Sequence, residues 1–229
     1  MDYNTFTERV NRYLLRVATL EIILSITLVF MPIALRFEDD WRPWRPSISD
    51  YVYTECGHIF GMFFTAAAFM FIYNGVIYFK KEAEILKFRL SEKIGDNEAY
   101  KINKLENSQP PGAWYNVVLG ISLLLVMLLP YLENIVLHYF FAVVFFAGSI
   151  ALMLFLKSNV QRGLAYFLAG ISSVSLVLHL ILGCKYPLFW AEWVAFTAIA
   201  IHYVAEALTK IKRQNKLDGI KKQSLYKKL

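Results

Sequence analysis

The chain has 229 residues, of which 57% are hydrophobic and only 18% are charged, and its formal net charge is +6. An ordinary soluble domain has about 45–50% apolar and about 25% charged residues, so this composition excludes a disordered chain and disfavours a soluble domain. The mean hydropathy of +0.43 favours a chain that lies largely in a membrane. The meaning of the net charge depends on where the 24 Lys and Arg residues fall.

Six apolar stretches follow one another along the chain and predict six membrane-crossing helices. Each is close to the roughly 20 residues that a helix needs to cross about 30 Å of hydrocarbon. None alternates apolar and polar residues as a membrane strand would. We therefore predict an all-α, polytopic membrane bundle over residues 14–208. Its predicted spans are 14–35, 59–79, 114–129, 135–156, 163–182 and 188–208.

The first stretch also has a feature of a cleaved signal peptide, because basic residues precede it. However, its apolar segment is long, contains Glu21 and lacks an Ala-x-Ala cleavage site. We therefore expect it to be a membrane span.

The basic residues collect on one side of the predicted bundle. The side that holds residues 1–13, the connection 80–113 and the tail 209–229 receives 20 of the 24 Lys and Arg residues, whereas the outer loop 36–58 is acidic and aromatic. The positive-inside rule then places both termini in the cytoplasm, in the inner or plasma membrane if the source is bacterial. The polybasic tail would attract anionic lipid, and no aromatic-interleaved basic groove indicates nucleic acid.

Histidines and acidic residues gather near the outer ends of the predicted spans. Ionisable groups inside hydrocarbon are costly, so a set of them at one depth indicates a site. The leading hypothesis is an outer-leaflet site that binds or handles a lipid or a small molecule. The candidate residues are Asp50, Glu55, His58, Glu133, His138, Ser175, His179 and Glu192.

A zinc-dependent lipid hydrolase is one alternative, with His58, His138 and His179 as metal ligands. Three protein ligands and an open water position are typical of catalytic zinc, which lowers the pKa of that water to about 7. Ser175 and His179 resemble the Ser-x-x-x-His element of the alkaline ceramidase and progestin-receptor-like superfamily. That superfamily also has a His-x-x-x-His pair and usually seven helices, whereas His202 stands alone here.

Two further alternatives belong to other functional classes. A haem b protein is less favoured than a zinc enzyme. A pair of haems at two depths would need two inner histidines, and only His202 lies there, so one haem between two of the outer histidines is what remains. The other is a structural or accessory membrane subunit, acting in a homo-oligomer or with a partner subunit, whose histidines only tie helices together.

A smaller polar group lies in the inner half of the bundle. His202 and Glu206 are four residues apart and share a helix face, and Glu21 lies at a similar depth. Such a group could relay protons or hold a cation, or it could fix the packing of the helices.

Both cysteines are expected on the outer side. A disulfide between Cys56 and Cys184 would staple two outer loops together in an oxidising compartment. The alternative is two free thiols.

Two short elements resemble the DRAM-type superfamily of six-helix membrane proteins, which includes autophagy modulators and GPI-lipid-remodelling factors. Ile48-Ser49-Asp50 precedes the second span, and Glu192-Trp193 lies early in the sixth. The resemblance implies six helices with cytoplasmic termini, a lipid-related role, and Asp50 and Glu192 as shared positions that brace the outer loop against the last span. Where the family has Gly and then Pro-Glu, only Glu55 is a counterpart here.

Overall fold

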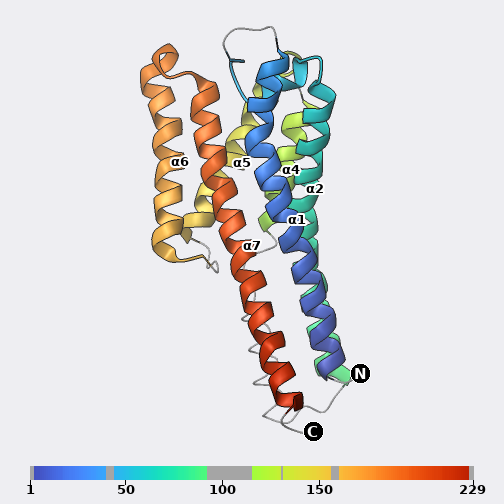
Figure 1. Ribbon diagram of the computed structural model, residues 1–229. Helices are drawn as coiled ribbons and strands as arrows, with labels where there is room; N and C mark the ends of the chain where they lie inside the picture. The colour runs from blue at the N-terminus through green and yellow to red at the C-terminus, as the bar shows by residue number, and fades with distance from the viewer. Residues whose placement is uncertain (1–2, 40–43, 92–114, 130, 156–159, 227–229) are drawn as a thin grey trace.

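The computed structural model describes residues 3–39, 44–91, 115–129, 131–155 and 160–226. The described residues form helices and turns without a strand, which confirms the all-α prediction (Figure 1). The long helices are α1 (Tyr3–Glu38), α2 (Gly57–Ser91), α4 (Tyr115–Leu128), α5 (Ile135–Phe155), α6 (Arg162–Leu182) and α7 (Leu188–Tyr226), and the short 3-10 turns are η1 (Ser49–Tyr53) and η2 (Gly183–Lys185).

Five of the described helices contain a segment long and apolar enough to cross a membrane. The sixth, α4, is apolar but has only 14 residues, and residue 114 of the span expected there lies outside the described residues, as does most of the expected connection 80–113. The five segments are Ala18–Glu38, Gly57–Val76, Ile135–Phe155, Arg162–Lys185 and Leu188–Lys212.

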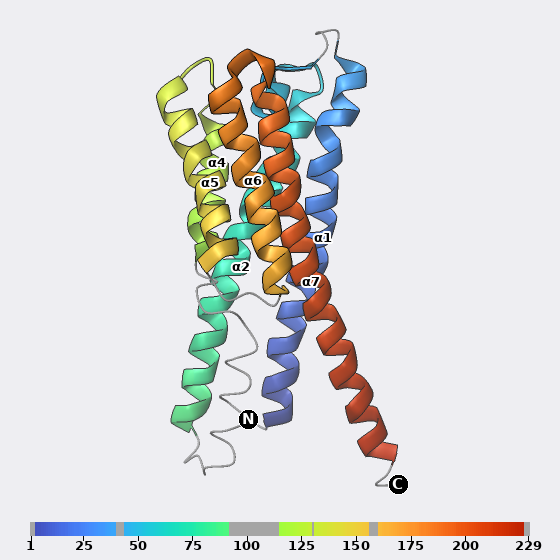
Figure 2. The same ribbon diagram turned by 90° about the vertical axis from the view of Figure 1, so that its left-hand side faces the viewer.

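Three helices are much longer than the spans predicted for them. Figure 2 shows α1, α2 and α7 running past the ends of α4, α5 and α6, toward the end of the molecule where both termini lie. The polybasic tail predicted from residue 209 is therefore largely a continuation of α7, which ends at Tyr226. Lys, Gln and Leu make up much of this stretch, and these residues have high helix propensity even without an apolar face.

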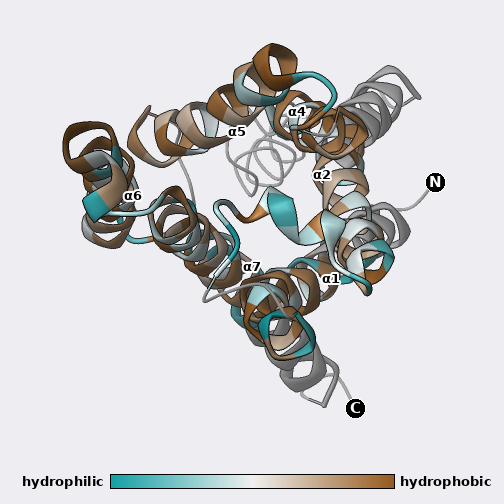
Figure 3. Cartoon of the chain, turned by 90° about the horizontal axis from the view of Figure 1, so that it is seen from above, coloured by the Kyte–Doolittle hydropathy of each residue, from teal (hydrophilic) through white to brown (hydrophobic). Residues whose placement is uncertain are grey.

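A loop folded into one end of the bundle closes it. We call residues 44–56 the plug and this end of the molecule the plug end. Seen from that end, α1, α2, α4, α5 and α7 surround the plug, and α6 lies outside this ring against α7 (Figure 3). Tyr51 at the centre of the plug is fully buried, and Ile48 is nearly so.

The helices around the plug pack through aromatic side chains and one very close backbone contact. Phe64 lies against Phe196 with ring centroids 5.7 Å apart, which joins α2 to α7. A Cβ atom on Gly120 would lie 2.6 Å from the Ala68 carbonyl oxygen, so only glycine lets α4 approach α2 this closely. Small residues at such contacts drive helix association in lipid, where no hydrophobic effect acts between helices.

Candidate functional site

The plug is held to α7 by its backbone. The Ile48 N–H donates to the Glu192 carboxylate at 2.9 Å, and the Phe189 N–H donates to the Pro46 carbonyl at 2.8 Å. Within the plug, the Ser47 N–H donates to the Asp50 carboxylate at 3.0 Å. Glu192 and Asp50 therefore satisfy backbone donors that the folded loop would otherwise bury without a partner.

His138 joins the plug to α4 and α5. Its Nδ1 lies 2.9 Å from the Leu129 carbonyl oxygen, and its Nε2 lies 3.0 Å from the Ser49 hydroxyl. Because a carbonyl only accepts, Nδ1 carries a proton and donates it to Leu129, and Nε2 is left to bond with the Ser49 hydroxyl. His138 is only 4% exposed, and both of its ring nitrogens bond to neighbouring residues.

Aromatic rings and an ion pair complete the attachment of the plug. Trp44 stacks on Phe189 with centroids 5.0 Å apart, and Tyr51 lies 5.8 Å from the same ring. Arg45 makes two hydrogen bonds to Asp39, at 2.7 and 2.9 Å, and they raise the pKa of the guanidinium. The plug is thus fixed by contacts on several of its faces.

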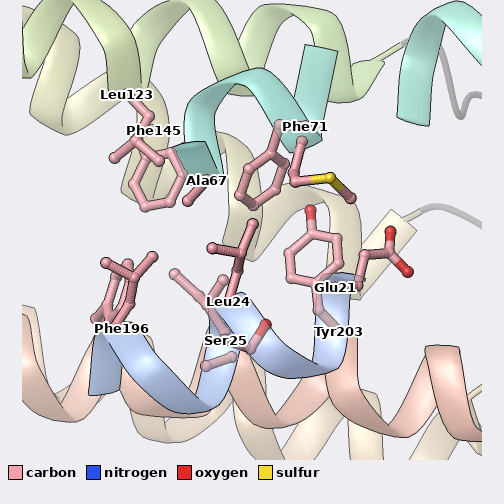
Figure 4. Close-up of a pocket in the computed structure, with 13 residues that line it drawn as sticks. Glu21, Leu24, Ser25, Ala67, Phe71, Leu123, Phe145, Phe196 and Tyr203 are labelled. Carbon is pink, nitrogen blue, oxygen red and sulfur yellow. The ribbon is translucent and has the colours of Figure 1, made fainter. Parts of the chain in front are cut away.

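Two small cavities lie beneath the plug along the centre of the bundle. The nearer one, of about 30 Å³, is lined by Ser49, His138 and Glu192, and the farther one, of about 40 Å³, by Glu21 and Tyr203. Figure 4 shows the farther cavity, with Glu21 and Tyr203 at one end and three apolar residues at the other. Each volume suits a few water molecules, since one water needs about 10–15 Å³. The apolar residues Leu123, Phe145 and Phe196 line both cavities and lie between them.

A charged cluster lies at the far end of these cavities. Lys210 Nζ lies 3.6 Å from one Glu21 oxygen and 3.5 Å from one Glu206 oxygen, and Asn74 donates its amide to the other Glu21 oxygen. The sequence predicted Glu21 and Glu206 here but missed Lys210 and Asn74. Lys210 follows Glu206 by four residues, a spacing that could have revealed it, whereas Asn74 had no signal beyond being polar in an apolar run.

Among the described residues, no hydrogen bond joins His202 to this charged cluster. The ring is fully buried, and neither ring nitrogen has a hydrogen-bond partner among the described residues. Its neighbour Tyr203 donates to the Asn116 side chain at 3.2 Å, which ties α7 to α4.

A third polar group lies between α6 and α7 near the plug end. The Ser175 and Tyr186 hydroxyls are 2.8 Å apart, and His179 Nδ1 lies 2.8 Å from the Tyr186 carbonyl oxygen. Ser175 also donates to the Ala191 carbonyl at 3.2 Å. Ser175 and Tyr186 line a groove of about 460 Å³ on the outside of this helix pair, and the rest of its lining is largely apolar.

The structure does not gather the predicted outer residues into one site. Asp50, His138 and Glu192 meet at the plug, and Ser175 and His179 lie in the separate group between α6 and α7. The remaining three residues, Glu55, His58 and Glu133, are exposed.

The metal ligands proposed from the sequence are not brought together. His58 is exposed, His138 uses both nitrogens at the plug, and His179 faces the Tyr186 backbone. In the part of the chain that the structure describes, no group of three His, Cys, Asp or Glu residues could hold a metal ion. The less favoured alternative, a haem between two outer histidines, meets the same difficulty, because His138 and His179 belong to different clusters and His58 is exposed.

Of the two alternatives for the cysteines, the structure has the free thiols and not the disulfide. Cys56 and Cys184 are both free thiols, the first half-buried beside the core and the second exposed in η2.

A family model matches residues 30–207, which include the plug, all of α6 and most of the apolar part of α7. The chain belongs to the family of unknown function DUF7103. The matched range contains every outer residue discussed above, and it excludes Glu21 and Lys210 at the two ends of the charged cluster. No curated protein and no solved structure gives a significant match to the chain.

Proposed function

We propose that the chain is an integral membrane protein with six spans. In this proposal the short helix α4 crosses the membrane in addition to the five longer segments, and the plug end faces outward. Support comes from the direction of the helices. Both α2 and α5 begin at the plug end, since Gly57 follows the plug and His138 contacts Ser49. The chain must therefore return to that end between them, and α4 ends there, beside the Leu129 carbonyl that His138 contacts.

The basic residues support the same orientation. The side opposite the plug end receives 20 of the 24 Lys and Arg residues, which the positive-inside rule assigns to the cytoplasm with both termini.

Within this topology, we propose that the protein binds a phospholipid of the outer leaflet, with one acyl chain in the groove between α6 and α7. The observation that carries the proposal is the shape of this groove. It runs from Tyr166 to Leu178, twelve residues or about 18 Å along the helix axis. One leaflet contributes about 15 Å of hydrocarbon, so the groove matches the depth that one acyl chain reaches.

The plug end of the groove suits the polar part of a lipid. Ser175 and Tyr186 line it there with hydroxyl groups, which can bond to an ester or phosphate oxygen. The adjoining turn η2 carries the exposed Lys185, a cation of the kind that binds phosphate as a point charge. The proposed lipid-related role also agrees with the resemblance to the DRAM-type superfamily, and that resemblance is itself still a prediction.

Filling the groove with a side chain tests this function. Gly170 lines the groove, and nothing lies within 4 Å of the position its Cβ would take, so Gly170→Leu should fold normally and occupy the space. Gly163→Leu is the matched control, because Gly163 is also on α6, has the same open surroundings and does not line the groove. The probe is phosphatidylcholine with a photoactivatable group on its acyl chain, in nanodiscs that contain the full-length protein.

We expect Gly170→Leu to reduce photolabelling of α6 and α7 about fivefold, since the leucine takes space from the acyl chain and a loss of about 1 kcal/mol of contact weakens binding by about that factor. A label near the carboxyl end of the chain should map near Ser175 and Leu178, and a label near the methyl end near Tyr166. Equal labelling of Gly170→Leu and Gly163→Leu would overturn the proposal, as would labels spread evenly over all lipid-facing helices.

A further inference from the structure

The charged cluster at the inner end of the cavities is not electrically balanced. It contains two carboxylates, from Glu21 and Glu206, and one ammonium group, from Lys210. Glu21 is 8% exposed and Glu206 is 7% exposed, so both acids are removed from water. A buried net charge is costly, and inside a membrane-spanning bundle such groups mark ion and proton sites.

Among the side chains that the structure describes, the surrounding helices do not supply the missing positive charge. Beside Glu21, α2 contributes the uncharged Asn74, while α7 contributes Tyr203 and Lys210, and Lys210 also pairs with Glu206; Asn116 of α4, also uncharged, bonds to Tyr203. Among the described side chains, Lys210 is the only Lys or Arg that pairs with either acid. His202 could carry a charge only at the cost of charging a fully buried ring.

A second observation points to a ligand beside Glu21. The Oε2 atom of Glu21 is buried and accepts no hydrogen bond, although it faces Lys210 Nζ at 3.6 Å, and Glu21 lines the 40 Å³ cavity together with Ser25 and Tyr203. The lining of this cavity is largely apolar, and its side-chain oxygens come from Glu21, Ser25 and Tyr203, with Glu21 and Tyr203 at one end (Figure 4). Oxygen atoms are the ligands that small, hard cations prefer.

We infer that the Glu21–Lys210–Glu206 cluster binds one small monovalent cation, either a proton on a carboxylate or a sodium ion in the adjoining cavity. One added positive charge balances the cluster, whereas a divalent ion would leave it positive. Because the unfolded chain lacks this arrangement, the cation stabilises the folded protein in proportion to its occupancy.

The unfolding midpoint of the full-length protein in nanodiscs measures this binding. One arm lowers the pH in choline chloride, and the other replaces choline chloride by sodium chloride at constant pH and ionic strength. In one of the two arms we expect the midpoint to rise by about 3–5 °C for each tenfold increase in cation activity below saturation. For a proton, the stabilisation is present at low pH and is lost as the pH rises through the titration of the cluster.

Glu21→Gln separates this site from other titrating groups. The variant keeps an oxygen that can accept the Asn74 amide, but it removes one negative charge and so removes the need for the cation. We expect the rise in the midpoint to disappear in Glu21→Gln and to persist in Glu133→Gln, a control that alters an exposed acid. Glu206→Gln, which neutralises the other carboxylate, serves the same purpose if Glu21→Gln does not fold.

Binding of radioactive sodium to the wild type identifies the sodium arm directly, at a stoichiometry near one. The inference is overturned if the wild-type midpoint responds to neither cation. It is also overturned if the wild type and the two Gln variants show the same dependence on pH and on sodium.

Discussion

Glu192 connects the last helix to the plug through one hydrogen bond, and its chemistry decides how much that bond is worth. The carboxylate accepts the Ile48 N–H at 2.9 Å. Hydrogen bonds to an ionised acceptor are about twice as strong as neutral ones, but the larger penalty arises when a buried donor loses its partner altogether. Asp50 and His138 do comparable work for Ser47 and Ser49, so these three predicted residues brace the plug.

Two substitutions of Glu192 separate these contributions. Glu192→Gln retains an acceptor for Ile48 and should cost about 1 kcal/mol or less, whereas Glu192→Leu leaves the donor unpaired and should cost about 1–3 kcal/mol. Thermal unfolding in detergent measures the difference, at about 2–4 °C per kcal/mol for a chain of this length. Glu133→Leu, at an exposed position, is the control. Equal losses for the Gln and Leu variants would contradict the assignment.

At the scale of elements, the contact between α2 and α4 depends on backbone proximity. Gly120 on α4 lies against the Ala68 carbonyl and Ile72 of α2, and a Cβ atom at this position would clash with both. Gly61 on α2 faces the same helix pair but has only the end of Met127 within 4 Å. The two glycines therefore share a helix interface and differ in the space beside them.

This difference predicts opposite results for the same substitution. Gly120→Ala should destabilise the protein by about 1–3 kcal/mol, because the added methyl group forces α4 away from α2. Gly61→Ala should be neutral or stabilising, since alanine favours a helix over glycine by up to about 1 kcal/mol. The measurement is again the unfolding midpoint in detergent. A harmless Gly120→Ala variant would show that the two helices can separate without loss.

For the molecule as a whole, the long extensions of α1, α2 and α7 and the buried plug mark the two ends as different. One end carries the plug and the exposed Cys184, and the other carries the termini and most of the basic residues. The proposed orientation places Cys184 outside the cell.

Cysteine labelling tests this orientation. In a Cys56→Ser background, a membrane-impermeant maleimide should label Cys184 in intact cells. In a cysteine-free background, Lys216→Cys on α7 should be labelled only after the membrane is permeabilised. The reverse pattern would invert the topology, and labelling of both sites in intact cells would contradict a shared cytoplasmic location for the termini and the 20 basic residues.

Sequence-based prediction fails here for residues whose role depends on contacts with residues far away in the chain. The sequence predicts that Glu21, His202 and Glu206 lie at one depth. It does not predict that Lys210, which belongs to the basic tail, or Asn74 joins them. It also treated His58, His138 and His179 as one set, because depth along a helix can be read from residue numbers. The direction in which each ring points depends on how its helix is rotated within the bundle, and three such rotations sent the rings to different surroundings.

Local composition alone determined that this chain is all-helical, which segments are apolar enough to lie in a membrane and where its basic residues concentrate. These properties add up over neighbouring residues, so they can be read without knowing any long-range contact. Only the tertiary structure decided that the outer loop folds inward as a plug, that Lys210 reaches between two buried acids, and that α6 and α7 leave an apolar groove. Each of these depends on pairs of residues that are far apart in the chain, and packing and charge, not sequence distance, bring them together.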